Sequence, residues 1–396
     1  MFRALDSPNY RLIWAGSLLS NIGFWMQKVA QSWLVLELSD SAFLLGLDAF
    51  AADAPLLAFA LLGGILADRL DRRRLLMWTQ VASVGTALLL AALTFAGVVE
   101  VWHVIALSFL TGCIQAISVP TYLSFVPSLV PRQQLSSAIA LNSIQFNVSR
   151  MIGPALAGVL LAGPGAAGCF LANACSYLAV VVGLKRMKKT EAPADIRVPV
   201  GRSFRQGAAF VMRRRIIFKL LVVVFSLSFL AAPVVTFLPL FARDVLGSGP
   251  QGYSLLLALF GVGAVAGALS VATVADVRGK IGRVLIAAAG LALAILAFAW
   301  SRSLLLSSAM ALLGGAAVIA CNAQLNTMVQ SESPRRLRGR IMSMYGLAFR
   351  GGMPLGNLLA GALAQSYGGP IALTVNGIGI LIFVGCVYLS GMFREK

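Results

Sequence analysis

The sequence is poor in charged residues, and acidic residues are especially few. Asp, Glu, Lys and Arg together make up 12% of the 396 residues, and only 14 residues are acidic. A soluble protein carries about 25% charged residues, so this chain has too little polar surface to cover a water-soluble globule. Because 59% of its residues are hydrophobic, we predict an integral membrane protein whose units are bilayer spans rather than soluble domains.

Patterns typical of metal, redox or enzymatic chemistry are also missing. The five cysteines all fall in predicted spans without metal-ligand spacing, and we expect them to be small packing residues. His103, the single histidine, is expected at the external start of a helix as an interface residue. Since there is no nucleophile–base set, phosphate-binding loop or haem signature either, the sequence predicts neither an enzyme nor a bound metal or cofactor.

What the sequence has instead is a series of long apolar runs. Twelve of them approach the roughly 20 residues that a helix needs to cross a bilayer. They are Leu12–Leu36, Ala42–Ala67, Leu75–Val99, Val101–Val126, Leu135–Ala162, Ala166–Leu184, Ile216–Ala242, Tyr253–Ala275, Val284–Trp300, Leu304–Gln330, Ile341–Tyr367 and Ile371–Phe393. An even number of spans places both termini on one side of the membrane. The basic residues in the connections assign that side to the cytoplasm, in a bacterial-type inner membrane.

The one long connection, residues 185–215, is basic and separates the spans into two sets of six. We therefore predict an N-terminal six-helix bundle at residues 1–184 and a C-terminal bundle at residues 216–396. Within the connection, residues 204–215 fit a short helix lying on the anionic membrane surface. A basic linker that only enforces the topology explains the same residues.

The two sets of spans contain matching residues at a nearly constant separation. Arg150 and Arg350, each followed by a proline four residues later, are 200 positions apart. Asp68 and Asp276, each preceded by an alanine at the end of a span, are 208 positions apart. Internal duplication of a six-span unit is typical of secondary transporters, in which the substrate site lies between the halves near the bilayer midplane.

A charged stretch between the second and third spans, Gly64-Ile-Leu-Ala-Asp-Arg-Leu-Asp-Arg-Arg-Arg74, carries a recognisable motif. It resembles the loop signature Gly-x-Leu-Ala-Asp-Arg-x-Gly-Arg-Arg of the major facilitator superfamily, with Asp71 in place of the second glycine. Together with Asn9-Tyr-Arg11 and Arg338-Gly-Arg340, it makes the chain similar to the enterobactin-exporter and transmembrane-secretion-effector branch. The resemblance covers essentially the whole chain. It implies an all-α membrane protein with twelve transmembrane helices in two pseudo-symmetric six-helix bundles.

By this resemblance, the charged loop acts as a cytoplasmic latch against the other half of the protein. The role falls on the Asp68 carboxylate, which can meet the positive N-terminus of a helix, with arginines as helpers. The implied gate residues are Gly64, Asp68, Arg69, Arg72, Arg73, Asp276 and Arg340. The alternative is a charged turn that fixes the topology and has no gating role.

The fifth span partly matches a signature that is associated with exporters of this superfamily. Gly153, Pro154 and Gly158 fit the signature, whereas Ala157 replaces the first of its paired glycines. An ordinary, tightly packed helix is the alternative interpretation. The fourth span has no arginine where many proton-coupled drug exporters carry one, so their proton-relay scheme cannot be carried over unchanged.

Ionisable residues inside spans cost about 2.5–3.5 kcal/mol each, so they usually face a cavity or a partner. Five lie well inside the predicted spans: Lys28, Asp48, Asp53, Arg150 and Arg350. Asp53, near the midplane, is the best candidate for the coupling proton and Asp48 is the second, because a carboxylate there can gain and lose a proton as its surroundings change. A static ion pair between Asp53 and Lys28 is the alternative.

We predict a central substrate cavity lined by cations, amides and an aromatic ring. The arginines keep their charge, so they would either hold an anionic or carbonyl-bearing substrate or act as structural anchors. The predicted set is Asn21, Trp25, Gln27, Lys28, Gln31, Gln115, Asn147, Arg150, Asn322, Asn326 and Arg350. For the amides, hydrogen bonding between helices is the alternative.

The predicted function is proton-driven export, by alternating access, of a small amphipathic molecule such as a drug or a siderophore-like metabolite. An uncoupled facilitator or importer is the first alternative, and a non-transporting receptor or assembly factor is a remote one. The expected partners of this monomer are the substrate, protons and the lipid bilayer. Nucleic acid is not expected, because the net charge of +18 is spread over short connections that cannot form a folded basic domain.

Overall fold

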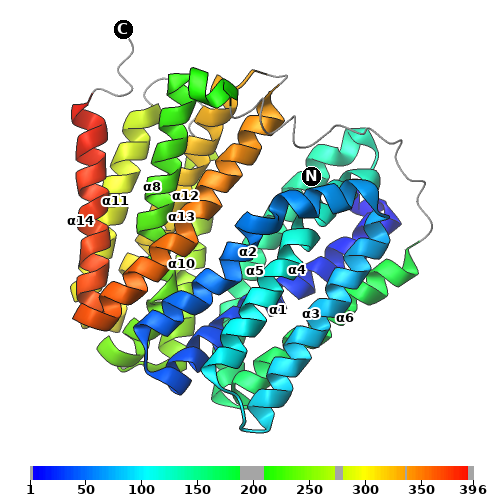
Figure 1. The fold of residues 1–396 in the computed structure, drawn as a ribbon, viewed down its shortest axis with the longest axis horizontal. Coiled ribbons are helices and arrows are strands. Elements are labelled where there is room, and N and C mark those ends of the chain that lie inside the picture. Colours follow the sequence, from blue (N-terminus) through cyan, green and yellow to red (C-terminus); the bar gives the residue numbers. More distant parts are fainter. Residues whose placement is uncertain (1–2, 188–208, 273–279, 335–336, 391–396) are drawn as a thin grey trace. The chain divides into compact units, whose positions relative to one another are not determined.

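The computed structural model describes residues 3–187, 209–272, 280–334 and 337–390. Within these ranges the chain is helical and contains no strand. Its twelve long helices are α1 (Pro8–Ser39), α2 (Ala42–Arg69), α3 (Arg72–Phe95), α4 (Val101–Phe125), α5 (Leu135–Ala162), α6 (Gly165–Arg186), α8 (Arg215–Thr236), α10 (Gly249–Ala272), α11 (Lys280–Trp300), α12 (Leu304–Glu332), α13 (Arg338–Tyr367) and α14 (Gly369–Leu389) (Figure 1). Each corresponds to one predicted apolar run, so the all-α prediction is confirmed.

Ten of these helices are long and apolar enough, by length and composition, to cross a membrane. The two long helices outside that group are α1 and α13. Both carry polar residues along their length, including Lys28 in α1 and Arg350 in α13. Two of the twelve predicted spans therefore fall outside the group that is apolar enough to cross a membrane, and one of them, α1, contains five of the eleven residues predicted to line a cavity.

Two predicted runs end earlier than expected, for identifiable reasons. The helix α3 ends at Phe95 rather than Val99, because Gly97 adopts a left-handed conformation with φ 68°. Its N–H and that of Val98 donate to carbonyls of the last helical turn, which closes the helix. The helix α8 ends at Thr236 rather than Ala242, because Pro239 has no N–H to continue it. Short segments follow: α9 (Leu238–Leu240) and the π-helical η4 (Phe241–Val245).

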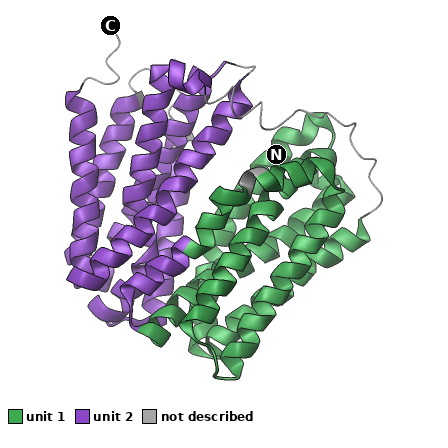
Figure 2. Ribbon diagram, in the orientation of Figure 1, with its two compact units in different colours: residues 1–39, 51–197 green, residues 40–50, 198–396 purple. Residues whose placement is uncertain are grey.

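The described chain forms two compact units (Figure 2). Unit 1 comprises residues 1–39 and 51–197, and unit 2 comprises residues 40–50 and 198–396. Inside unit 1, α1 packs against α5 and α6, and α3 packs against α4 and α6. Inside unit 2, α8 packs against α13, α10 against α12, and α11 against α12 and α14.

Glycines allow corresponding helices to cross closely in both units. A Cβ atom placed on Gly153 of α5, or on Gly352 of α13, would meet the same three kinds of atom on the crossing helix. These are a carbonyl oxygen, the Cβ three residues later and the amide nitrogen four residues later. They belong to Ile22 (2.8 Å), Trp25 (2.6 Å) and Met26 (3.1 Å) for Gly153, and to Phe225 (2.6 Å), Ser228 (3.1 Å) and Phe229 (2.7 Å) for Gly352.

These contacts correct the predicted pairing of the two arginines. They align Gly153 with Gly352, which is 199 positions later, and so align Arg150 with Phe349 rather than with Arg350. The mismatch arises because one extra residue, Met353, separates the glycine from the proline in α13. One residue turns a helix by about 100°, so the two arginines leave their helices in different directions.

A second pair of crossings repeats in the same way. A Cβ on Gly112 of α4 would lie 2.4 Å from the carbonyl oxygen of Ala52, and one on Gly315 of α12 would lie 2.0 Å from that of Phe260. From Ala52 to Phe260 the separation is 208 positions. The charged loop after α2 and its counterpart show the same separation in the sequence, which supports duplication of the helical unit.

Candidate substrate-binding site and gate residues

The described structure of unit 1 brings Trp25, Lys28 and Arg150 together. Trp25 lies on α1 with 9% of its surface exposed. The ammonium nitrogen of Lys28 lies 5.7 Å from the centroid of the indole ring, and the guanidinium carbon of Arg150 on α5 lies 5.5 Å from it. Each such cation–π contact contributes about 0.5–2 kcal/mol, depending on how dry the site is. The close α1–α5 crossing at Gly153 makes this approach possible.

Aromatic rings and a buried donor complete this cluster. The centroids of the Phe24 and Phe146 rings each lie 6.0 Å from that of Trp25, and each pair is T-shaped. The indole N–H of Trp25 is buried, and no residue in the described ranges accepts a hydrogen bond from it. No carboxylate of the described residues forms a salt bridge with Lys28 either. The cluster therefore offers positive charge and hydrogen-bond donors beside an apolar wall.

The amides of α1 that were predicted to line the cavity bond mainly within the helix packing. The Gln27 side-chain carbonyl accepts a hydrogen bond from Asn173 of α6 at 2.6 Å. Gln31 donates to Ser108 of α4 and accepts from Gln27 at 3.4 Å. These bonds join α6, α1 and α4, which is the alternative that the sequence left open. Asn21 donates to a carbonyl of its own helix at 2.8 Å.

The other predicted polar residues lie apart from this network. Asn147 on α5 donates to a carbonyl of its own helix at 2.8 Å, and Gln115 is half-buried on α4. In unit 2, the backbone carbonyl of Asn322 accepts from the Tyr345 hydroxyl at 3.1 Å. The Asn326 side chain accepts from Gln330 at 2.6 Å.

Unit 2 contains no equivalent of the tryptophan–cation cluster at the matching positions. Ser228 stands where unit 1 has Trp25, and Phe349 stands where it has Arg150. The Ser228 hydroxyl donates to the Phe349 carbonyl. Arg350 is exposed on α13, one residue further along. The site is thus asymmetric, although the helix crossing that supports it is duplicated.

The two acidic candidates lie on α2, in different units. Asp53 is half-buried in unit 1. It follows Ala52, whose carbonyl oxygen faces Gly112 of α4. Asp48 is buried, with 5% exposure, and belongs to unit 2. In the described part of the chain, Asp53 makes no salt bridge with Lys28, whose ammonium faces the Trp25 ring instead.

Two arginines of the charged loop bind carbonyl groups within unit 1. Arg72 donates to the carbonyls of Ala67 and Ser124, both at 3.2 Å. Arg73 donates to those of Leu184 at 2.9 Å and Lys185 at 3.2 Å. These carbonyls lie at the C-terminal ends of α2, α4 and α6, where a positive charge also meets the negative end of the helix dipole.

The remaining predicted gate residues are differently placed. Asp68 and Arg69 are exposed at the end of α2, and Arg340 is half-exposed in the first turn of α13. A Cβ on Gly64 would meet no described atom within 4 Å, whereas one on its neighbour Gly63 would lie 2.0 Å from a carbonyl of α4. Asp276 lies outside the described residues.

Sequence reasoning missed an ionic cluster in unit 2. Arg243 of η4 binds Asp244 at 2.5 Å and also Asp40, which precedes α2 and has a positive φ of 50°. The signal in the sequence was the presence of two acids and one arginine in segments predicted to be external. Because the two segments are about 200 positions apart, only the three-dimensional structure could show that they meet.

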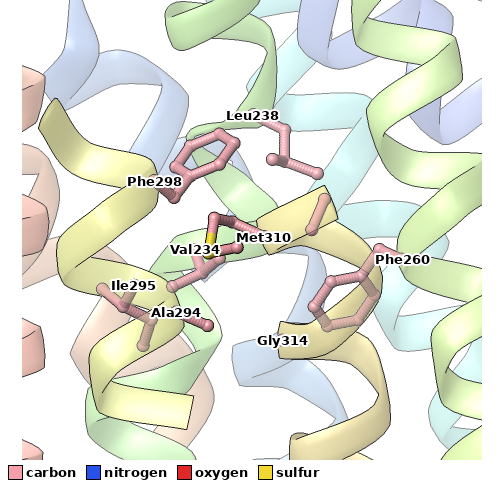
Figure 3. A pocket seen from close by; sticks show the side chains of 9 residues that line it. Val234, Leu238, Phe260, Ala294, Ile295, Phe298, Met310 and Gly314 are labelled. Carbon is pink, nitrogen blue, oxygen red and sulfur yellow. The ribbon is translucent and has the colours of Figure 1, made fainter. Parts of the chain in front are cut away.

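Unit 2 also encloses a small apolar cavity between α8, α10, α11 and α12 (Figure 3). Its lining includes Phe260, Phe298, Met310 and Gly314, and its volume is about 10 Å³. A buried water needs about that volume and at least two polar partners, which these side chains do not provide. The cavity is therefore a packing defect of the helix bundle and too small for a substrate.

Comparisons with known proteins agree with this architecture. The profile of the family described as transmembrane secretion effector matches residues 1–394. The staphyloferrin A transporter of Staphylococcus aureus (strain NCTC 8325 / PS 47) is 25% identical over 96% of this chain and 95% of its own. The multidrug efflux pump Tap of Mycolicibacterium fortuitum is 27% identical over 90% and 89%. The enterobactin exporter EntS of Citrobacter koseri (strain ATCC BAA-895 / CDC 4225-83 / SGSC4696) is 24% identical over 95% and 90%.

Solved structures share the fold at low sequence identity. The nucleoside transporter NupG aligns with a TM-score of 0.75 and 14% identity, over 98% of this chain and 100% of its own. A bacterial homologue of the human lysosomal transporter Spinster, in an inward-facing and occupied conformation, aligns with a TM-score of 0.78 and 14% identity over 97% of both chains.

The helices and these likenesses define the class of protein: a multi-pass membrane transporter of the major facilitator fold, and not an enzyme. Within that class, the chain belongs to the transmembrane secretion effector family. The resemblance to this family, predicted from Gly64–Arg74, Asn9–Arg11 and Arg338–Arg340, is confirmed.

Proposed function

We propose that this transporter exports a small amphipathic molecule by proton antiport. The observation that carries the proposal is the cluster of Trp25, Lys28 and Arg150, which places charge and a buried donor beside aromatic rings in a transporter chain. Relatives described as an enterobactin exporter and a multidrug efflux pump support export of amphipathic compounds. The siderophore and drug classes in those names are the first substrates to test.

Asp53 carries the coupling proton in this proposal, with Asp48 as the second candidate. Asp53 lies 11 residues into α2, about 16 Å from the start of the helix. An acid at that depth can be charged in one conformation and neutral in the other, provided that its access to water changes. Its neighbour Ala52 is held against α4 at Gly112, so the acid sits on a rigid helix crossing.

The proposed transport cycle is alternating access by two six-helix bundles, residues 1–184 and 216–396, joined by the basic linker 185–215. The transporter acts as a monomer in the cytoplasmic membrane, with both termini in the cytoplasm. Asp68 and Arg69 form the cytoplasmic latch, because they are exposed and Arg72 and Arg73 are engaged with carbonyls of unit 1. Arg340 and Asp276 belong to the same proposed gate.

Flux into proteoliposomes tests the coupling. Vesicles with an acidic lumen and a clamped membrane potential are offered a naphthalene ring that carries either a sulfonate or a quaternary ammonium group. Both groups stay charged at all pH values, so neither probe redistributes passively with pH. Protons leaving the lumen should accumulate at least one of the probes up to about ten-fold per pH unit at one-to-one coupling. Failure of both probes to accumulate would contradict the proposal.

The Asp53→Asn variant tests the proton site. We expect it to lose accumulation and to keep exchange of the probe down its own gradient, because the amide cannot release a proton. Dissipation of the gradient with an ionophore should reproduce that loss in the wild-type protein. If accumulation persists in Asp53→Asn, Asp53 does not carry the proton, and the same measurement on Asp48→Asn tests the second candidate.

A further inference from the structure

We infer that Trp25, Lys28 and Arg150 form a subsite for the acidic group of the substrate, and that the substrate is an anion with an attached aromatic or apolar body. This deepens the proposed function and rests on it. Among the described residues, these three side chains are the place where two cations lie over one ring. The substrate class follows from what such a group of donors can bind.

The positive charges of the subsite favour an acidic ligand. Lys28 and Arg150 bring two positive charges within 6 Å of the same ring centroid, at 5.7 and 5.5 Å. No described carboxylate forms a salt bridge with Lys28. A positive charge inside a membrane protein is costly unless it is compensated. An anionic substrate compensates the charge of Lys28, whereas a cationic one adds repulsion.

The hydrogen-bond donors of the subsite also favour an acidic ligand. The Trp25 indole N–H is buried and has no acceptor among the described residues. A buried donor without a partner is unfavourable, and a ligand that provides an acceptor removes this penalty. The side chains of tryptophan, lysine and arginine donate hydrogen bonds and cannot accept them. The polar part of the subsite is therefore best matched by a ligand group with several acceptor atoms. A carboxylate, sulfonate or similar oxyanion has them.

Two further aromatic rings can contact the aromatic or apolar part of the substrate. Phe24 and Phe146 present their rings to Trp25, and Phe146 is 50% exposed. An aromatic or apolar group that extends from the acid can lie against them. Unit 2 has serine and phenylalanine in place of the tryptophan and the arginine. The acid is therefore expected to bind in unit 1.

Equilibrium binding to the purified full-length protein in lipid nanodiscs tests the inference with three probes of one shape. They are naphthalenesulfonate, the uncharged naphthalenesulfonamide, and naphthalene carrying a quaternary ammonium group. We expect the sulfonate to bind about ten-fold tighter than the sulfonamide, as for a hydrogen bond to a charged group. The ammonium probe should not compete with it. Equal affinity for the sulfonate and the sulfonamide would overturn the inference.

Substitutions test which residues cause the preference for the sulfonate over the sulfonamide. Lys28→Gln and Arg150→Gln should each reduce sulfonate affinity about ten-fold and leave sulfonamide affinity within about two-fold. Arg150→Lys, which keeps the charge, should retain most of the preference even if Arg150→Gln folds poorly. Trp25→Phe keeps an aromatic ring and removes the N–H, so it should weaken sulfonate binding several-fold. Arg302→Gln, at an exposed site between α11 and α12, is the matched control for loss of one positive charge.

The outcomes separate this inference from the proposed function. Persistence of the acid preference in both Lys28→Gln and Arg150→Gln would overturn the subsite, whether or not the protein transports. An acid preference without proton-driven accumulation in proteoliposomes would contradict proton antiport and leave the subsite standing. Proton-driven accumulation of the ammonium probe but not the sulfonate would support antiport and overturn the acidic substrate.

Discussion

Asp71 stands where the superfamily loop signature has glycine, and its conformation shows why glycine is not required there. The residue has φ −61° and ψ 113°, which any L-amino acid can adopt. Its carboxylate accepts a hydrogen bond from the backbone N–H of Arg74 at 2.7 Å and so caps the first turn of α3. The charge also faces the positive end of that helix. The substitution has therefore gained a helix cap without losing a turn.

Asp71→Ala should lower the free energy of unfolding by about 1 kcal/mol, because the first turn of α3 loses its cap. Asp71→Gly, which restores the family residue, should cost only a few tenths of a kcal/mol, since glycine lets water reach the freed N–H. Thermal unfolding of the purified protein in detergent compares the two variants. If glycine destabilises as much as alanine does, the Asp71 carboxylate acts through something other than this cap.

The cluster around Trp25 shows how far single residues could be assigned from the sequence. Charge, position and helical spacing were enough to select Trp25, Lys28 and Arg150 as candidates, and the structure brings these three side chains together. Their contact depends on which face α5 turns toward α1, and that face is set by Gly153 against the backbone of α1. Gln27 and Gln31 looked equally suitable, yet their partners Asn173 and Ser108 draw them into helix packing. Residue type alone cannot distinguish these two fates.

At the scale of helices, hydrophobic runs predicted every long element, because span length is set by the thickness of the bilayer. The ends depended on local chemistry, as Gly97 and Pro239 show. The register of the repeat was wrong by one residue at the arginines, because a match of sequence letters takes no account of which residues touch the neighbouring helix. Glycine contacts define that register directly.

The neighbouring glycines of α12 give a matched test of helix crossing. A Cβ on Gly315 would lie 2.0 Å from the carbonyl oxygen of Phe260, whereas one on Gly314 would meet side chains at ordinary distances of 3.8 and 3.9 Å. Gly315→Ala should push α10 and α12 apart and cost about 1–3 kcal/mol. Gly314→Ala should fill part of the small cavity and gain up to about 1 kcal/mol of helix stability.

Thermal unfolding midpoints of the two alanine variants should therefore move in opposite directions from that of the wild-type protein. Each variant is the control for the other, since both replace a glycine in the same turn of the same helix. A fall in both midpoints would show that the cavity is already closed in solution. A rise in both would show that α10 and α12 do not cross as closely as the structure has them.

For the whole molecule, the charged loop after α2 has two groups of residues in different surroundings. Arg72 and Arg73 tie the loop to the ends of α2, α4 and α6. Asp68 and Arg69 are exposed. The motif identified the family, because its charges stand out between two apolar runs. Residue type alone could not separate the residues that hold the loop from those that are exposed and available to the proposed gate.

Asp68→Asn and Arg73→Gln test whether these two groups of residues have separate roles. Arg73→Gln removes a charged donor from two backbone carbonyls, so it should lower the free energy of unfolding by about 1.5–3 kcal/mol. Asp68→Asn replaces an exposed carboxylate by a group of the same shape, so it should leave stability within about 0.5 kcal/mol of the wild type. If the proposed latch is correct, Asp68→Asn should nevertheless slow transport, measured as initial uptake into proteoliposomes at equal protein content. Unchanged uptake in Asp68→Asn, together with destabilisation by Arg73→Gln, would assign the loop to folding and topology and remove it from the gate.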